Sequence, residues 1–344
     1  MKKIWLFSLL GCLLLATLVV TLWPSDPDQA RWDDYLQRLS RLTRQPVPPP
    51  GDLPLHPYPG ARQLQLPTPR ASVNLLDFLT LRRCQLITLV SQHNSSLGKV
   101  QAASLDLGYQ VAFIRRTRQC LRQQRLEDAT LTRTLAQVVA DKVNALPGYY
   151  WNAVVNSDEL RHFFNQSPQA RAGDLPSSLE ALQFLVARPI TVRQLPATPL
   201  TRLEQQLTVL AHNQGGGYLL RRLALSNREL RRANRMLAAV NSARLCPGGQ
   251  HSTRARYLRN LLDHVWGPKV QRALAEATRN QQQLDTLTDK LATLVSPTPA
   301  SFARWRSYYF GPGGLRDQQK QALHRHVQLW QALLGDCGLM PGQR

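Results

Sequence analysis

The sequence contains few of the residues that metal and redox centres need. Its 344 residues include five cysteines and eight histidines, and neither a CxxC nor an HExxH motif occurs. His324 and His326 lie two positions apart, a spacing that turns two helical side chains to different faces. We therefore expect no zinc site, and nothing in the sequence indicates a cofactor.

Glycine and runs of alternating β-branched residues are also scarce, whereas leucine, alanine, glutamine and arginine dominate. These residues favour helices over strands. The expected fold is therefore all-α: a multi-helix bundle with long antiparallel helices, an N-terminal transmembrane helix and a proline-rich extended strap.

The N-terminal segment has the composition of a membrane anchor. Lys2 and Lys3 precede an uncharged, mostly apolar stretch, residues 4–23, with Trp5 and Trp23 at its edges. A stretch of this length can cross ~30 Å of hydrocarbon as a helix, and tryptophans are common at membrane interfaces. Because lysines favour the cytoplasmic side, we predict a single-pass inner-membrane protein whose remaining residues lie in the periplasm.

Two alternatives remain open for this segment. It ends without the small-x-small pattern of a cleavage site, which argues against removal of the anchor. Leu9-Leu10-Gly11-Cys12 partly matches a lipoprotein signal, although the apolar region before Cys12 is short. An uncleaved signal-anchor is the prediction, with acylation at Cys12 or cleavage as the alternatives.

Four cysteines lie beyond the anchor: Cys84, Cys120, Cys246 and Cys337. An even number in an oxidising compartment predicts two disulfides, and four cysteines allow three pairings. If residues 75–93 and 104–124 form an antiparallel hairpin, Cys84 and Cys120 fall at the same level. That pairing leaves Cys246 for Cys337, and free buried thiols are the alternative.

Composition divides the rest of the chain into three segments. Residues 24–45 predict an amphipathic juxtamembrane helix. Residues 46–70 predict an extended linker, because nine prolines fall within 46–69. Residues 71–340 are predicted to form the helical periplasmic domain, a length sufficient for one large domain or two small ones of ~100–200 residues each.

Hydrophobic spacing predicts most of the helices. They are expected at residues 31–44, 73–93, 103–125, 128–144, 157–164, 178–187, 201–210, 218–245, 252–266, 268–294 and 315–334. From residue 218 onward, apolar or small positions alternate by four and three, as in a heptad seam: Leu219, Leu223, Ser226, Leu230, Ala233, Leu237 and Val240. Such a seam implies a partner helix.

Several positions are expected to start or interrupt these helices. Thr201 and Glu204 match a capping box at a helix start. Residues 215–217 are three glycines without the lysine and hydroxyl residue of a phosphate-binding loop, and they are interpreted as a hinge. Residues 267–268, Gly-Pro, are expected to kink or break a helix pair. The aromatic-rich stretch 296–314 is expected to be a loop.

Candidate catalytic residues are few. His93 with Ser95 or Ser96 is the one compact combination of a base and a hydroxyl nucleophile beside a turn. Asn94 and Ser95 also suit the end of a helix, and we favour that interpretation. No residue is therefore assigned a catalytic role.

Two further groups have both a structural and a functional interpretation. Asp77 is an acidic residue within the apolar stripe of the first helical hairpin, and we expect it to pair with Arg115 or Arg116 rather than to act as a catalytic acid. The aromatic residues 149–151 are expected to close the edge of a core rather than to line a ligand pocket.

The strongest functional signal is positive charge. The formal net charge is +21, and residues 218–260 include ten arginines against a single acidic residue, Glu229. Guanidinium groups bind phosphate and carboxylate bidentately. We assign a binding role to six arginines expected on a cationic helix face opposite the heptad seam: Arg221, Arg222, Arg228, Arg231, Arg232 and Arg235.

The predicted compartment restricts what such a face could bind. Nucleic acid is scarce beyond the inner membrane, so the expected partner is an anionic lipid, a glycolipid or an acidic protein surface. A solvated helix face without a ligand is the alternative interpretation. The expected function is that of a membrane-anchored periplasmic binding protein, with a hydrolase of cell-wall or lipid substrates as the alternative.

Several short stretches together resemble one uncharacterised family. They are Leu75-Leu76-Asp77-Phe78-Leu79, Cys84, Asn94-Ser95-Ser96-Leu97-Gly98-Lys99, His326, Trp330, Cys337 and Gly338. The family is the gammaproteobacterial lipoprotein family known as the domain of unknown function numbered three thousand and eighty, and the resemblance extends from about Trp32 to Gly338. It implies an envelope location and little about chemistry. The chain departs from the lipoprotein pattern because no cysteine lies near Trp23.

Overall fold

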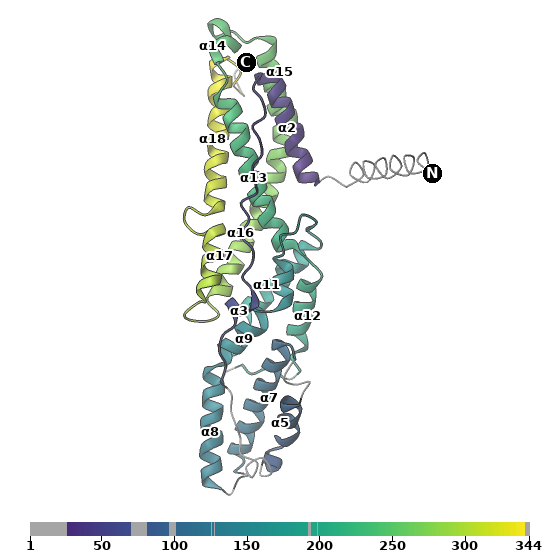
Figure 1. Cartoon of the computed structure of the whole chain (residues 1–344), viewed down its shortest axis with the longest axis vertical. Helices are drawn as coiled ribbons and strands as arrows, with labels where there is room; N and C mark the ends of the chain where they lie inside the picture. Colours follow the sequence, from purple (N-terminus) through teal and green to yellow (C-terminus); the bar gives the residue numbers. More distant parts are fainter. Residues whose placement is uncertain are drawn as a thin grey trace, which may run out of the picture. The chain divides into compact units, whose positions relative to one another are not determined.

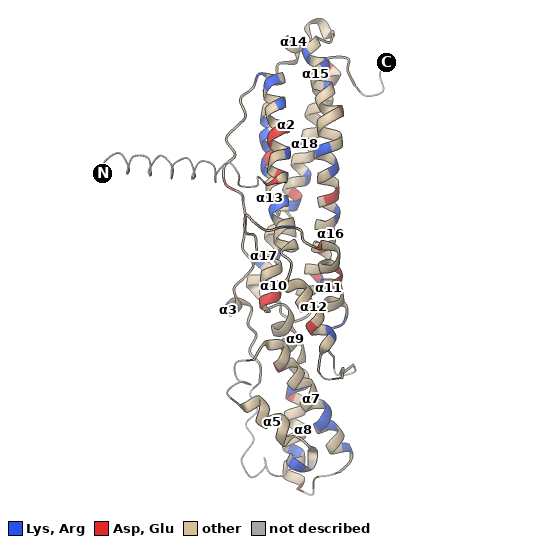
Figure 2. Cartoon of the chain, turned by 90° about the vertical axis from the view of Figure 1, so that its right-hand side faces the viewer, with Lys and Arg blue, Asp and Glu red and all other residues tan. Residues whose placement is uncertain are grey.

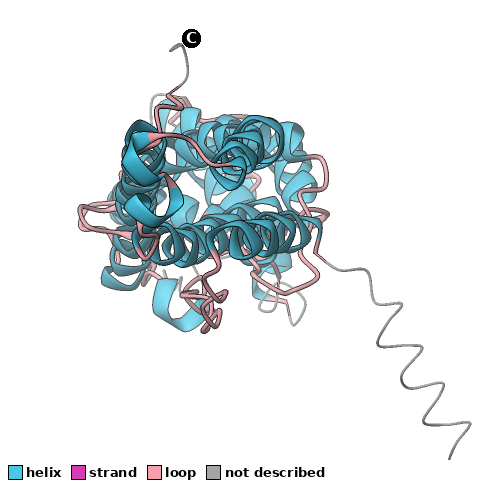
Figure 3. Ribbon diagram, turned by 90° about the horizontal axis from the view of Figure 1, so that it is seen from above, coloured by secondary structure: helices cyan, strands magenta, loops and turns pink. Residues whose placement is uncertain are grey.

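The computed structural model describes residues 26–69, 81–95, 101–124, 126, 128–191, 194–197 and 199–340 (Figure 1). The regular elements of these residues are helices, with one isolated bridge between Thr191 and Gln194 and no strand (Figure 3). The all-α class is therefore confirmed. The predicted anchor, residues 4–23, lies outside the described residues, as do Cys12 and Asp77. No described helix is both long and apolar enough to cross a membrane.

The helices up to residue 211 are α2 (Pro27–Thr43), α3 (Ala61–Leu64), the 3-10 helix η1 (Leu81–Cys84), α5 (Ile87–Asn94), α7 (Ala103–Arg122), α8 (Ala129–Asn144), α9 (Leu146–Val154), α10 (Asp158–Phe163), α11 (Leu175–Ala187) and α12 (Thr201–Ala211). They are followed by α13 (Gly215–Ala238), α14 (Ser242–Leu245), the 3-10 helix η2 (Pro247–Gly249), α15 (Thr253–Leu261), the π-helix η3 (Leu262–Gln271), α16 (Arg272–Ala292), α17 (Ala300–Phe310) and α18 (Leu315–Asp336). The helices predicted at 31–44, 103–125, 128–144 and 315–334 are confirmed to within a few residues.

The chain divides into two compact units. Unit 1 comprises the residues up to Gly51, Arg228–Ala275 and the residues from Ala322 onward. Unit 2 comprises Asp52–Asn227 and Glu276–Gln321. Three of the four boundaries fall within the sequences of α13, α16 and α18, and the fourth lies between Gly51 and Asp52, outside any helix.

Unit 1 packs α2 against α15 and η3 around aromatic rings. Asp26 accepts a hydrogen bond from the backbone N–H of Asp28, and Pro27 occupies the first turn, where a missing N–H costs nothing. Trp32 and Tyr35 are buried on the inner face of α2, and the Tyr35 ring centroid lies 5.2 Å from that of Trp266. The apolar residues at helical spacing along α2 thus form part of the core of this unit.

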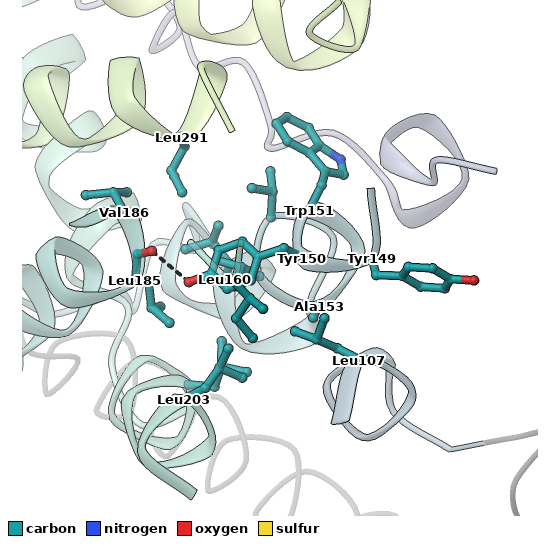
Figure 4. Packing of buried hydrophobic residues seen from close by; sticks show 14 of the residues in the cluster. Leu107, Tyr149, Tyr150, Trp151, Ala153, Leu160, Leu185, Val186, Leu203 and Leu291 are labelled. Atoms are coloured by element: carbon teal, nitrogen blue, oxygen red, sulfur yellow. Dashed lines mark hydrogen bonds between the residues drawn. The ribbon is translucent and has the colours of Figure 1, made fainter. Parts of the chain in front are cut away.

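The core of unit 2 contains the aromatic residues 149–151, which lie within α9 (Figure 4). Tyr150 donates a hydrogen bond to the carbonyl of Leu185 at 2.7 Å, and Trp151 donates one to the carbonyl of Leu64 at 2.8 Å. The buried hydroxyl of Tyr150 and the buried N–H of Trp151 therefore each have a partner, as burial requires. These residues form the interior of the unit rather than only its edge.

The proline-rich strap, residues 46–69, is extended as predicted, apart from the single-turn helix α3. Proline lacks a backbone N–H and fixes its own φ, so neither a helix ladder nor a central strand can form over residues 46–59. The carbonyl groups remain available as acceptors, and side chains of the helices use several of them.

Two disulfides are present, and they have the predicted pairing. Cys84 is bonded to Cys120 and Cys246 to Cys337, each with Cα atoms 5.3 Å apart. The first joins η1 to α7 within unit 2, and the second joins the end of α14 to the end of α18 within unit 1. The pairing predicted for Cys84 with Cys120 is confirmed.

Two predictions of local structure were wrong. The helix expected at 73–93 is interrupted at Gln85, whose φ of 57° is left-handed, so η1 and α5 are separate. The loop expected at 296–314 contains α17, whose Phe302, Trp305 and Tyr309 are fully buried at helical spacing. The number of aromatic and glycine residues there obscured a regular apolar stripe.

Two expected helix boundaries also differ from the structure. Pro268 lies inside η3, where the N–H of Arg272 bonds to the carbonyl of Gly267, five residues earlier. The wider π-helical turn accommodates a proline that an α-helix would reject, so α15, η3 and α16 follow one another without a break. Helix α12 starts at Thr201 after Leu200, and no side chain caps it, so the predicted capping box does not form.

Residues 215–217, interpreted as a hinge, form the first turn of α13. A Cβ atom on Gly217 would lie 1.9 Å from the carbonyl oxygen of Asn165, and one on Gly216 would lie 2.5 Å from Phe163. The glycines are therefore required for the close approach of α13 to α10 and the residues after it.

Candidate functional site

Helix α13 carries the six arginines that were predicted to bind an anion. Leu219, Leu223 and Leu230 of its seam are fully buried, as the heptad spacing predicts. The arginines do not share one environment. Arg231 and Arg235 are exposed, Arg221, Arg222 and Arg228 are half-buried, and Arg232 is only 7 % exposed.

A buried carboxylate explains the position of two of these arginines. Glu229 is fully buried. Arg228 Nε donates to Glu229 Oε1 at 2.7 Å, and Arg232 Nη1 donates to Oε2 at 2.5 Å. Both carboxylate oxygens are thus compensated by guanidinium groups, as a buried charge requires.

The same two arginines hold the strap within unit 1. Arg228 Nη1 donates to the carbonyl of Gly51 at 3.1 Å, and Arg232 Nε donates to that of Pro48 at 2.7 Å. Arg228 Nη2 also donates to Gln29 Oε1 at 2.8 Å. Arg228 and Arg232 therefore belong to an internal network and not to the solvent-facing surface expected from the sequence.

Of the remaining arginines of α13, Arg231 and Arg235 are exposed and Arg221 and Arg222 are half-buried. Arg231 and Arg235 lie one turn apart on the surface of unit 1, whose helices carry many basic positions (Figure 2). In unit 2, the guanidinium of Arg222 lies 5.4 Å from the ring centroid of Tyr218, a cation–π contact. Of the six arginines that were assigned a binding role, only Arg231 and Arg235 are thus exposed.

A second polar network in unit 1 surrounds His326. Its Nδ1 bonds to Asn234 Oδ1 at 2.8 Å, and its Nε2 lies 2.9 Å from the hydroxyl of Tyr35. Trp330 Nε1 donates to both Nε2 and the Tyr35 hydroxyl, at 3.1 and 3.2 Å. Asn234 Nδ2 donates to the carbonyl of Ala322, so its Oδ1 is the acceptor and the neutral His326 carries its proton on Nδ1.

Burial lowers the pKa of His326 to about 3, so the ring stays neutral over the physiological range. Each polar atom of the ring has a partner. His326 and Trp330, which contributed to the family resemblance, therefore stabilise the core of unit 1 and do not face a ligand.

In unit 2, His93 belongs to a polar chain that sequence reasoning missed. Its Nε2 lies 3.0 Å from Asp106 Oδ1, and its ring stacks on Tyr109 with centroids 3.7 Å apart. Asp106 also accepts from Gln110 Nε2 at 2.9 Å, and Gln110 Oε1 accepts from Lys142 Nζ at 2.5 Å. Burial lowers the pKa of Lys142. The partner of His93 comes from α7, 13 residues further along the chain, so no local motif indicates it.

A pocket of about 890 Å³ opens beside these hydrogen-bonded side chains. His93, Ser95, Ser104 and Arg116 are among the residues that line it. The hydroxyl of Ser95 donates to the carbonyl of Gln92 at 2.7 Å, which is a helix-end contact and agrees with the interpretation we favoured. The structure thus places His93 and Ser95 on one pocket. Ser96 lies outside the described residues.

Asp77 lies outside the described residues, so its pairing with Arg115 or Arg116 stays a prediction, and within the described residues both arginines donate to backbone carbonyls. Arg115 Nη1 donates to the carbonyl of Pro196 at 3.0 Å, and Arg116 Nη1 donates to that of Gln85 at 3.1 Å.

Within the described ranges, no group of three or more histidine, cysteine, aspartate or glutamate side chains could hold a metal ion.

Comparison with known proteins gives one match. A family profile described as "Protein of unknown function (DUF3080)" matches residues 32–341 of the chain. Comparison with curated proteins and with solved structures gives no match. The family match covers the whole range of the sequence resemblance, from about Trp32 to Gly338.

Proposed function

The chain belongs to the DUF3080 family of proteins of unknown function, and from its own residues we propose that it is a membrane-anchored binding protein of the periplasm. In this proposal residues 4–23 form an uncleaved signal-anchor, and the helical units engage an anionic component of the cell envelope. The function is recognition, not catalysis.

Two features support the location. Disulfides persist in oxidising compartments, and the chain contains two, one in each compact unit. The lysines before the apolar stretch favour an orientation with the folded units on the far side of the inner membrane.

The observation that carries the binding proposal is the position of Glu229. It is the only acidic residue among residues 218–260, and it is buried and compensated by Arg228 and Arg232. Glu229 is therefore engaged inside unit 1, and the net positive charge of residues 218–260 remains on their other arginines, of which Arg231 and Arg235 are exposed. Guanidinium groups so placed suit a phosphate or a carboxylate.

Crosslinking in intact cells tests this proposal. The full-length protein is crosslinked, purified from the membrane fraction and analysed by mass spectrometry. We expect an anionic lipid, a glycolipid or an acidic protein to accompany the wild type, and we expect Arg231→Glu with Arg235→Glu to remove it. Arg133→Glu with Arg304→Glu changes the charge equally at two exposed positions of unit 2 and is expected to retain the partner. Recovery of the same molecules with both double variants would contradict the proposal.

A second candidate function is an envelope hydrolase, as the sequence also allowed. The observation that favours it is the His93–Asp106 contact on the 890 Å³ pocket, because a carboxylate that orients a histidine is one half of a general-base arrangement. The full-length protein would be tested with p-nitrophenyl carboxylate and phosphate esters. Hydrolysis that falls at least tenfold in His93→Gln supports this candidate, and rates equal to those of the variant exclude it for these esters.

A further inference from the structure

A second pocket in unit 2, of about 620 Å³, lies between α11, α12 and the segment that connects them. Its wall includes Tyr150, Ile190, Leu200 and Leu203, which are each at most 8 % exposed. The hydroxyl of Tyr150 is already bonded to the carbonyl of Leu185 at 2.7 Å. The tyrosine therefore offers the pocket an aromatic surface, and an apolar occupant fits this wall best.

Two guanidinium groups lie at the edge of this pocket. The guanidinium of Arg188 lies 5.2 Å from the ring centroid of Phe184, and that of Arg202 lies 5.5 Å from the same centroid. Arg188 follows Phe184 by one helical turn at the end of α11, and Arg202 belongs to the first turn of α12. Two different helices thus bring positive charge to one half-buried ring.

The charge of these arginines is not neutralised by nearby acids in the part of the chain that the structure describes. Neither Arg188 nor Arg202 forms an ion pair there with an aspartate or glutamate, and both side chains are exposed. Like charges at one site repel, and an anion between them would relieve that repulsion. The electrostatics of the rim therefore favour a negatively charged group.

We propose that this pocket binds an anionic amphiphile. A single alkyl chain would pack on Ile190, Leu200 and Leu203, and a carboxylate or phosphate head group would bind Arg188 and Arg202. The volume is within the usual ~300–1,000 Å³ of small-molecule sites. This site is separate from the arginines of α13 and does not rest on the function proposed for them.

Photoaffinity labelling of the full-length protein in phosphatidylcholine nanodiscs tests the proposal. The probes are dodecanoic acid, dodecyl phosphate and dodecanol, each with a diazirine on its alkyl chain. We expect saturable labelling of peptides within residues 184–203 by at least one of the two anions. Labelling by only one of them identifies the head group as carboxylate or phosphate.

The variant Arg188→Ala with Arg202→Ala is expected to reduce this labelling about tenfold, because two charge-assisted contacts are lost. Arg133→Ala with Arg304→Ala serves as the control and is expected to label like the wild type. Circular dichroism checks that both variants fold. Equal labelling by dodecanol and the anions, labelling that does not saturate, or unchanged labelling of the Arg188/Arg202 variant would each overturn the proposal.

Discussion

His326 links the stability of unit 1 to pH through a single side chain. It is fully buried among Tyr35, Asn234 and Trp330, and burial lowers its pKa to about 3. In the unfolded chain its pKa is ~6.5, so below that pH the unfolded state binds a proton that the folded state binds only near pH 3. This group therefore reduces the free energy of unfolding as the pH falls from ~6.5 toward 3, and it has no such effect above that window.

We expect urea unfolding of the wild type to show this dependence, with a slope from this residue of at most about 1.4 kcal/mol per pH unit. His326→Gln should lose that contribution and be less stable at pH 7 by about 1–3 kcal/mol, since it disrupts a buried hydrogen-bond network. His324→Gln, at an exposed position of the same helix, should retain the wild-type slope. An identical pH dependence for wild type and His326→Gln would refute this account.

Arg232 and Arg235 belong to the same helix but differ in their surroundings. Removal of the Arg232 guanidinium leaves the buried Glu229 with Arg228 alone and frees the carbonyl of Pro48. Arg232→Ala is therefore expected to lower the free energy of unfolding by about 3–5 kcal/mol. Arg235→Ala, at an exposed position, should change it by less than about 0.5 kcal/mol. Denaturant titrations measure both variants. If Arg232→Ala lowers the free energy of unfolding as little as Arg235→Ala does, Arg232 has no structural role.

At the scale of single elements, the start of α13 allows a matched pair of glycine substitutions. A Cβ on Gly217 would lie 1.9 Å from the carbonyl oxygen of Asn165, and that backbone can move only by displacing α10. Gly108 lies within α7 and has no atom within 4 Å of the corresponding position.

Gly217→Ala is expected to lower the free energy of unfolding by about 1–3 kcal/mol or more. Gly108→Ala should leave it unchanged or raise it by about 0.5–1 kcal/mol, because alanine stabilises a helix interior. Thermal unfolding followed by circular dichroism measures both variants. A neutral Gly217→Ala would mean that the first turn of α13 can move, as the hinge interpretation assumed.

Elements with a regular apolar stripe could be predicted from the sequence, and elements defined by tertiary contacts could not. Helices α2, α7, α8 and α18 follow their periodicity. The pairing of Cys84 with Cys120 was also predicted correctly, although the first helix assumed for it is interrupted at Gln85. Helix α17 was missed because its aromatic and glycine composition was given more weight than its spacing. The π-helix around Pro268 depends on hydrogen-bond register, which no local residue pattern specifies.

The same limit applies to the candidate sites. The arginine-rich helix was evident in the sequence, but the internal role of Arg232 depends on a strap carbonyl 184 residues away. His93 was noted as a possible base, whereas its partner Asp106 comes from a different helix, α7. Arg188 and Arg202 were not singled out, because only the packing of α11 and α12 brings both near Phe184.

At the scale of the whole molecule, the two disulfides constrain different lengths of chain. Cys84 and Cys120 are separated by 36 residues, and Cys246 and Cys337 by 91. Loop entropy predicts a stabilisation of about 4 kcal/mol for the first and about 5 kcal/mol for the second. We expect Cys246→Ser with Cys337→Ser to be at least as destabilising as Cys84→Ser with Cys120→Ser.

Thermal unfolding with and without dithiothreitol measures these contributions. Reductant should lower the midpoint of the wild type, and it should lower the midpoint of each double serine variant by less. A wild-type midpoint that does not respond to complete reduction, verified by thiol titration, would show that neither crosslink contributes to stability.

The chemistry of the strap has a further consequence. Its prolines accept hydrogen bonds and donate none, and Arg232 and Tyr308 bind the carbonyls of Pro48 and Pro54. An extended segment with free N–H groups could recruit a strand from another molecule and begin aggregation. Seven of the 14 residues in 46–59 are prolines, which halves the number of those donors, so the chain keeps an extended surface segment that is poorly suited to serve as the edge of an intermolecular sheet.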